Sequence, residues 1–261
     1  MAEKIQGKRI LLDPLGGLYL DERVRQWLFQ KKPVANVSGD VITAEVSSTV
    51  FDLLHTVGAD AFATRCMKRS RFEIGESRQP MFRECAGQYL RHCEIRPSLR
   101  VDKTKNKLPQ SVWGEGATTL ERDARARVNF AKYIKADLVV AIDVTNMVVD
   151  EGLEVRHNGF GAASLVAENV VKEVAKRTRR KTFKVSGLMD DEAHYADVGA
   201  PVVILNCGSV LDPLTAKFLR DDWYRHFLAL GLFAGIWKSL AASSYGAVPL
   251  DVLTSTRPKS P

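Results

Sequence analysis

The sequence predicts an α/β domain in which a mostly parallel central sheet has helices on both faces and carries a basic insertion. First, short apolar runs alternate along the chain with segments whose apolar residues recur every three or four positions, which is the order strand, helix, strand. Second, several runs are apolar at consecutive positions, as is typical of strands covered on both sides. With 261 residues, 45% hydrophobic and 26% charged, the composition excludes a collagen-like or wholly disordered chain.

Three elements are predicted before the insertion. The helix among them places Ile42, Val46 and Val50 on one stripe, at the spacing of an amphipathic helix. Gly58 ends this helix, because glycine favours the backbone conformation that follows a helix C-terminus. In chain order, these elements are a strand over residues 8–14, a helix over 41–57 and a strand over 60–65.

Residues 66–117 form the predicted insertion. No hydrophobic period persists there, and Pro80, Pro97 and Pro109 interrupt the segment. A helix over 80–91 is the best candidate for regular structure. The segment holds eleven Lys and Arg residues against six Asp and Glu residues, so +5 of the formal net charge of +7 lies in the insertion.

Regular structure is predicted again from residue 119. The last helix carries a wide apolar stripe that we expect to pack across the sheet; its members are Leu219, Trp223, Phe227, Leu230, Ala234 and Trp237. The predicted elements are a helix over 119–131, strands over 136–143 and 152–157, a helix over 162–177, a strand over 201–206 and a helix over 219–237.

We expect a single domain over residues 1–247 and a loose tail over 248–261. The longest apolar run, 227–237, has 11 residues, whereas a membrane span needs roughly 20. The polar start of the chain lacks the apolar stretch of a secretory signal. Four cysteines are too few for a disulfide scaffold of this size, which favours a reduced interior.

The basic residues indicate an anionic partner, such as an acidic protein, a glycan or nucleic acid. Six of the nine residues in 176–184 are also basic, although a solvated helix end is the favoured explanation for this second cluster. Aromatic side chains that could stack bases are sparse in the insertion, which disfavours a nucleic-acid groove. The arginines predicted to contact the partner are Arg69, Arg71, Arg78, Arg179 and Arg180.

Five short motifs follow one another along the chain. They are Leu12-Asp-Pro-Leu-Gly-Gly17, Ala44-Glu45-Val46 followed by Thr64-Arg65, Arg127-Val-Asn-Phe-Ala131 followed by Ala141-Ile-Asp143, Gly152-Leu-Glu-Val155, and Pro201-Val-Val-Ile-Leu-Asn-Cys-Gly208 followed by Asp212-Pro213. In this order they resemble the zinc-dependent N-acetylmuramoyl-L-alanine amidases, hydrolases that remove the stem peptide from muramic acid in bacterial cell walls. The resemblance covers most of the chain outside residues 18–40 and 66–117.

The resemblance implies a zinc ion held by His, Glu and His, with a second Glu on the last strand as general base. Here the first His position is Leu15 or is lost in a one-residue deletion, and the other positions are Glu45, Asp143 and Asn206. Only Glu45 keeps the family's residue type, and an asparagine such as Asn206 accepts no proton at neutral pH. Asp13 retains the acid that supports the metal-bearing loop in the family. The resemblance therefore implies the fold and leaves the activity open.

Three hypotheses remain. The leading one is a pseudoenzyme that binds or assembles without hydrolysis and needs no cofactor. The second is a peptidoglycan hydrolase rebuilt around Glu45 and Asp143, with His194 as a further candidate, and with zinc or a harder cation such as Mn²⁺ or Mg²⁺. The third is amidase activity through other residues. The partner would be an acidic protein or a cell-wall glycan. Because host amidases usually need export, a cytoplasmic or phage-associated protein is expected.

Each of these candidate site residues also has a simpler structural explanation. Glu45 lies beside the apolar stripe of its helix and could form an ordinary salt bridge. Asp143 ends a strand, where it could cap the turn that follows. Cys85, His92 and Cys93 lie close together in the insertion, but a zinc site there would need a fourth ligand.

Overall fold

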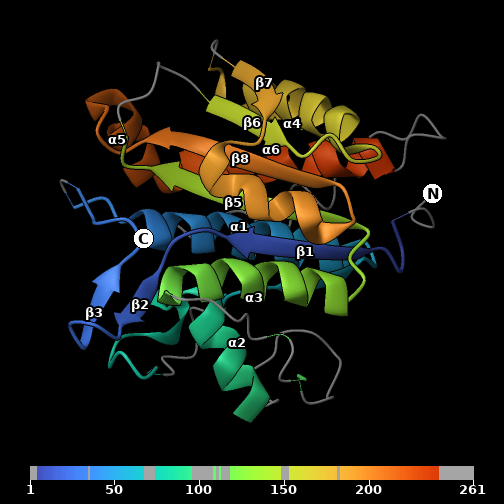
Figure 1. Ribbon diagram of the computed structural model, residues 1–261. Coiled ribbons are helices and arrows are strands. Elements are labelled where there is room, and N and C mark those ends of the chain that lie inside the picture. Colours follow the sequence, from blue (N-terminus) through green and yellow to red (C-terminus); the bar gives the residue numbers. More distant parts are fainter. Residues whose placement is uncertain are drawn as a thin grey trace.

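The computed structural model describes residues 5–34, 36–67, 74–95, 108–109, 112, 118–147, 153–180 and 183–240. Its centre is a six-stranded sheet with the strand order β4-β1-β5-β8-β6-β7 (Figure 1). The sheet is mostly parallel and has helices on both faces, which confirms the predicted fold class. The strands are β1 Arg9–Pro14, β4 Asp60–Ala63, β5 Leu138–Thr145, β6 Leu153–His157, β7 Phe183–Gly187 and β8 Val202–Ser209.

Strand direction determines which residues meet at each edge of the sheet. Strands β4, β1, β5 and β8 run parallel to one another, whereas β6 pairs antiparallel with β8 and parallel with β7. The carboxyl ends of β1, β5 and β8 therefore lie beside the amino end of β6. This is the edge at which open α/β sheets bind ligands.

Two apolar clusters fill the space on either side of the sheet. One lies under α1, α4, α5 and α6, and the other under α2, α3 and the 3₁₀ helix η5. Figure 1 shows α3 and η5 crossing one face and α1 and α6 the other. The helices are η2 Met81–Arg83, α1 Gly39–Thr56, α2 Ala86–Ile95, α3 Thr119–Tyr133, α4 Ala163–Thr178, η5 Asp190–Val198, α5 Pro213–Arg220 and α6 Asp222–Leu240.

Helices α4 and α6 pack closely because two glycines of α6 face α4. A Cβ atom at Gly231 would lie 2.6 Å from the Cα atom of Val174, and one at Gly235 would lie 2.4 Å from the Cα atom of Val170. Any side chain at these positions would push the helices apart. The predicted apolar stripe of the last helix therefore omits the residues that make its closest contact.

The last helix differs from its prediction in two ways. It is broken into α5 and α6 at Asp221, whose backbone is extended with φ −77° and ψ 120°. Asp212 begins α5, since its carboxylate accepts hydrogen bonds from the backbone N–H groups of Leu214 and Thr215. After the break, the buried face of α6 leaves Trp223 and Phe227 exposed at 48% and 38%, so these two side chains do not pack across the sheet.

The predicted helix over 80–91 is displaced toward the C-terminus. Pro80 and Glu84 are extended, with ψ angles of 131° and 150°, and only the short η2 lies between them. Helix α2 begins at Ala86 instead. Glu84 is fully buried and accepts hydrogen bonds from the Ser77 backbone N–H at 2.8 Å and from the His92 ring, which holds this residue outside the helix.

Three elements were not predicted. The hairpin of β2 Leu18–Asp21 and β3 Gln26–Phe29 forms a separate two-stranded sheet. Strand β7 at the sheet edge and η5 were also missed. All three are mostly half-buried or exposed, so they lack the continuous apolar runs that identify central strands.

Several predictions fall on residues that the structure does not describe. These are the tail over 248–261, Arg69, Arg71 and much of the insertion. Within the described part of the chain, no helix is both long enough and apolar enough to span a membrane.

Candidate functional site

A row of side chains crosses the carboxyl edge of the sheet. Asp143 of β5 is in register with Asn206 of β8, which is in register with Glu154 of β6. Leu15 continues the row at the end of β1, where its N–H donates to the carbonyl of Ile142 at 2.8 Å. The structure thus brings together three of the four positions singled out in the sequence, Leu15, Asp143 and Asn206, on the face covered by α3 and η5.

Asp143, Asn206 and Glu154 of this row line a hollow of about 270 Å³. The hollow is lined by the edge of the sheet, by the segment that follows β3 and by the start of η5. Besides the row, Lys31, Arg156 and Asp191 contribute charged groups to it. We refer to it as the edge hollow.

Asp143 is only 5% exposed, and basic side chains of the same chain compensate its charge. The Lys31 ammonium donates a hydrogen bond to Oδ1 of Asp143. Nη2 of Arg156 lies 3.9 Å from Oδ2 of the same carboxylate. Among the described residues, the Asp143 carboxylate therefore faces two cations.

Arg156 is the centre of a buried ion-pair network. Its Nε and Nη2 donate to both carboxylate oxygens of Glu192 at 2.6 to 3.0 Å, and its Nη1 donates to Glu154 at 2.7 Å. Burial alone lowers the pKa of Arg156, but Glu192 and Glu154 outweigh it and raise that pKa. This forked pairing fixes the guanidinium as a permanent cation in the edge hollow.

Asn206 is turned toward its own backbone. Its side-chain carbonyl oxygen accepts a hydrogen bond from the Gly208 N–H at 2.9 Å, and the residue is 4% exposed. The group at the position of the family's general base therefore stabilises the end of β8. Its neighbour Cys207 is a fully buried core residue.

Glu45 lies away from this row. Its carboxylate pairs with Nε of Arg225 on α6 at 2.6 Å. It lines a different hollow, between α1 and the end of α5, to which Asp143 does not contribute. The simple salt bridge considered for Glu45 is thus present, and the lining of the edge hollow does not include it.

His194 lies on η5, beside a buried cluster under the sheet edge. In this cluster Asp13 is fully buried and accepts hydrogen bonds from Arg127, from the Tyr195 hydroxyl and, at 2.5 Å, from Thr64. Burial and the charge of Arg127 lower the pKa of His194. His194 does not line the edge hollow.

The turn after β1 is held from beneath by Arg65, which is completely buried. Its guanidinium donates to the carbonyl oxygens of Pro14 at 3.1 Å, Leu15 at 3.3 Å and Glu84 at 2.9 Å. Gly17 in this turn has φ +116°, and a Cβ atom there would lie 2.8 Å from the backbone nitrogen of Cys85. The insertion thus packs against the turn that carries Leu15.

The other sequence-predicted residues are dispersed. Cys85 and Cys93 are buried core residues, while His92 pairs with Glu84. Arg78 is exposed in the insertion. At the end of α4, Arg179 is exposed with a left-handed backbone, and Arg180 stacks on the Phe218 ring of α5 at 5.1 Å.

The sequence analysis did not identify Lys31, Arg156 and Glu192. Lys31 lies in a segment without periodicity that is outside the family resemblance, and Glu192 lies on an unpredicted 3₁₀ helix. Arg156 had a usable signal, since a charged residue two positions after Glu154 on a predicted strand faces the same side.

Solved structures resemble the whole described architecture. A Clostridium difficile 630 N-acetylmuramoyl-L-alanine amidase aligns with a TM-score of 0.55 over 92% of this chain and 100% of its own. The CwlD amidase of Clostridioides difficile, in complex with the GerS lipoprotein, gives 0.56 over 90% and 100%, and AmiC2 of Nostoc punctiforme gives 0.56 over 90% and 99%. The chain has the N-acetylmuramoyl-L-alanine amidase fold. Identities of 14%, 15% and 14% support the fold alone, and no protein-family model and no curated protein matches the sequence.

Within this amidase fold, the positions that the resemblance assigns to zinc carry a different set of side chains. Leu15 offers no donor atom, and it packs against the apolar cluster beneath α3. The carboxylates of Glu45 and Asp143 are each paired with basic side chains. Among the described residues, no three His, Cys, Asp or Glu side chains are arranged to hold a metal ion. This donor set does not match the three ligands and open position of a catalytic zinc site.

Proposed function

We propose that this chain is a non-hydrolytic protein of amidase fold that works by binding a protein partner. The observation that carries the proposal is the pairing of Asp143 with Lys31 and Arg156. A tethered ammonium and a divalent cation compete for the same carboxylate, and the tethered group is always present. The edge hollow is thus neutralised from within the chain.

The remaining chemistry of the edge hollow supports the same proposal. Hydrolysis of an amide bond by a metal-bound water needs a base to take the proton of that water. Asn206 supplies none, and the carboxylates of Glu154 and Glu192 are held in ion pairs by Arg156. The rebuilt hydrolase, with a metal on Glu45 and Asp143, is disfavoured because Glu45 faces Arg225 in another hollow.

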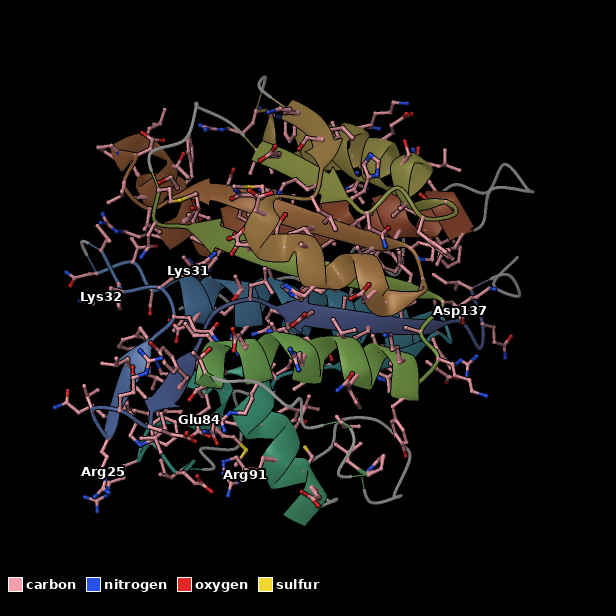
Figure 2. The ribbon with its side chains drawn as sticks, in the orientation of Figure 1. Arg25, Lys31, Lys32, Glu84, Arg91 and Asp137 are labelled. Atoms are coloured by element: carbon pink, nitrogen blue, oxygen red, sulfur yellow. The ribbon has the colours of Figure 1, made fainter. Side chains whose placement is uncertain are left out.

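The proposed partner is an acidic protein. The CwlD amidase with the same fold is known in complex with a lipoprotein, so a protein partner is compatible with this architecture. On the hairpin and insertion side, Arg23, Arg25 and Arg78 are exposed, and none has a carboxylate within ion-pair distance in the described part of the chain. Figure 2 shows Arg25 and Lys32 at the outer edge of the molecule beside β3.

Release of stem peptide from purified peptidoglycan tests the absence of hydrolysis. The full chain, supplied with Zn²⁺ or Mn²⁺, is expected to release no more peptide than a reaction without protein. Glu45→Ala and Asp143→Ala should leave this baseline unchanged. Release that either substitution abolishes would establish the rebuilt hydrolase instead.

Binding to an acidic polypeptide tests the partner. Poly-glutamate should bind the chain, with an affinity that falls as salt rises. Arg25→Glu combined with Arg78→Glu should weaken binding at least tenfold, whereas Lys132→Glu combined with Lys217→Glu, an equal change of charge at exposed positions elsewhere, should have a smaller effect. Equal losses would show charge attraction without a surface, and selective binding to purified cell-wall glycan would replace the protein partner with a glycan.

A further inference from the structure

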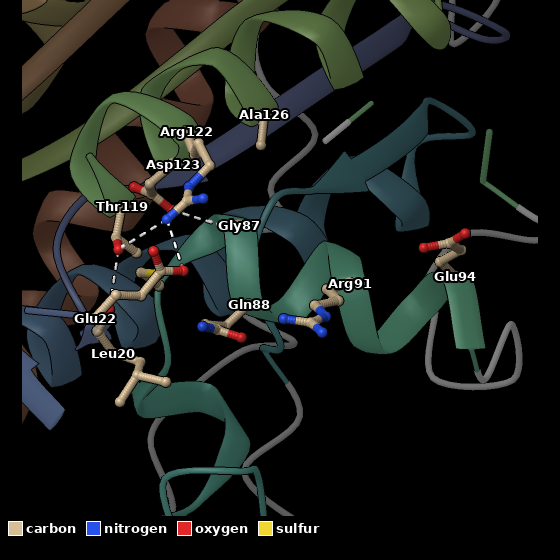
Figure 3. A pocket seen from close by; sticks show the side chains of 11 residues that line it. Leu20, Glu22, Gly87, Gln88, Arg91, Glu94, Thr119, Arg122, Asp123 and Ala126 are labelled. Atoms are coloured by element: carbon tan, nitrogen blue, oxygen red, sulfur yellow. Dashed lines mark hydrogen bonds and ion pairs between the residues drawn. The ribbon is translucent and has the colours of Figure 1, made fainter. Parts of the chain in front are cut away.

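A second hollow, of about 390 Å³, lies between α2, α3 and β2, away from the edge hollow. It is within the size range of small-molecule sites. Helix α2 belongs to the insertion, whereas α3 belongs to the amidase fold. We refer to it as the helix hollow; Figure 3 shows it with its lining side chains.

The two helices are joined at the floor of the helix hollow. The N–H of Gly87 on α2 donates to Oδ1 of Asp123 on α3 at 2.6 Å. Oδ2 of Asp123 accepts from Gln30 at 2.8 Å and from Nε of Arg127 at 3.0 Å. These hydrogen bonds, with the charge of Arg127, hold the pKa of Asp123 below its ordinary value although burial alone raises it. Asp123 is therefore ionised, and both of its carboxylate oxygens already accept hydrogen bonds from the chain.

Gln88 of α2 lies in the wall of the helix hollow, and its side chain lacks one hydrogen-bond partner. The residue is 9% exposed, and in the described part of the chain no donor reaches its side-chain oxygen Oε1. A buried amide oxygen without a donor is costly, and a ligand N–H would satisfy it. Apolar surface from Leu20, Cys85 and Ala126 lies beside it.

Charges of both signs border the same space. Arg91 lies one helical turn after Gln88, and no described carboxylate is within ion-pair distance of it. On the other side of the hollow, Glu22 pairs with Arg122 at 2.7 Å, and the Glu22 side chain is 63% exposed. Figure 3 shows the Glu22–Arg122 pair facing Gln88 and Arg91 across the hollow.

We propose that the helix hollow binds a small zwitterion of the size of a free amino acid. Its carboxylate pairs with Arg91. Its ammonium donates to Oε1 of Gln88 and to the Glu22 carboxylate, and its side chain lies on Leu20 and Ala126. This arrangement gives partners to Arg91 and to the Gln88 oxygen, which have none in the described part of the chain, and it adds the ammonium to the existing Glu22–Arg122 pair. It joins the insertion to the amidase fold through the ligand.

The test is thermal unfolding of the full chain with each common amino acid at up to about 10 mM, followed by calorimetric titration of any that stabilises it. At least one amino acid should raise the melting temperature. Gln88→Met and Arg91→Ala should each weaken its binding at least tenfold. Gln6→Met and Arg220→Ala, which make the same changes at exposed positions outside the helix hollow, should leave binding unchanged.

A second readout separates ligand binding from a mere packing defect. Gln88→Met removes the unpaired oxygen, so the ligand-free variant should melt no lower than the unmodified chain while it loses the ligand-induced shift. If Gln88→Met does not fold, the exposed Arg91→Ala decides alone. The proposal is overturned if no amino acid stabilises the chain, or if binding survives both substitutions.

Discussion

The edge hollow and the helix hollow differ in whether their polar side chains have partners within the described part of the chain. In the edge hollow, Asp143 and Glu154 each pair with a cation of the same chain, as does the neighbouring Glu192, while the exposed Asp191 has no described cation within ion-pair distance. In the helix hollow, Arg91 has no described carboxylate partner and Gln88 has an oxygen without a donor. A site whose charges are already compensated loses those pairs when it binds a ligand, whereas a site with unpaired groups gains new ones. We therefore expect the edge hollow to be the less receptive of the two to a ligand.

The largest expected effect is that of Arg156→Met in the edge hollow. Arg156 is 3% exposed, and its loss leaves Glu192 and Asp143 buried without their shared cation. The free energy of unfolding should fall by about 3–5 kcal/mol, measured by urea denaturation. Arg122→Met, in the exposed pair of the helix hollow, should cost less than about 1 kcal/mol. Equal costs would remove the contrast between the hollows.

A smaller effect is expected from the pair of Lys31 and Asp143. A double-mutant cycle of Lys31→Met and Asp143→Asn should give a coupling energy of about 1–2 kcal/mol, because the carboxylate is nearly buried and the ammonium only partly exposed. The corresponding cycle with Glu22→Gln and Arg122→Met should give about 0.2–1 kcal/mol. A coupling near zero for Lys31 would mean that it does not neutralise Asp143.

The smallest expected effect is a dependence on pH. Burial alone raises the pKa of Glu154, but hydrogen bonds from Ser186 and Arg156 outweigh it and hold that pKa below its ordinary value. Its contribution to stability is therefore complete above the ordinary carboxyl range and is lost as pH falls through the lowered pKa. Glu154→Gln should flatten the decline in unfolding free energy between neutral pH and about pH 3.

The control for this pH dependence is Glu168→Gln, which changes an exposed pair on α4. It should leave the acid decline as it is in the unmodified chain. If Glu154→Gln leaves the acid decline in unfolding free energy unchanged, the group responsible for that decline is not Glu154.

The fold was predictable because its central elements carry strong local signals. Strands β1, β5 and β8 are continuous apolar runs, and α1 and α4 have clear helical periods. Strand ends in a parallel sheet meet at one edge, so the proximity of Asp143 and Asn206 also followed from the sequence. The break at Asp221 and the exposure of Trp223 did not, since both depend on how α6 packs on α4.

The composition of the site was less predictable, because it depends on contacts between distant segments. Lys31 reaches Asp143 across 112 positions of the chain, and Glu192 reaches Arg156 across 36. No local pattern encodes such pairs. The helix hollow exists only because α2 packs on α3, and the sequence placed α2 in a segment without a period.

The most direct test of the central claim is the zinc content of the full chain, purified with zinc supplied and without chelators, measured by elemental analysis. If the edge hollow is neutralised by Lys31 and Arg156, zinc should remain far below one ion per chain, and Asp143→Ala should not change it. About one zinc ion per chain, lost in Asp143→Ala or Glu45→Ala, would contradict the account.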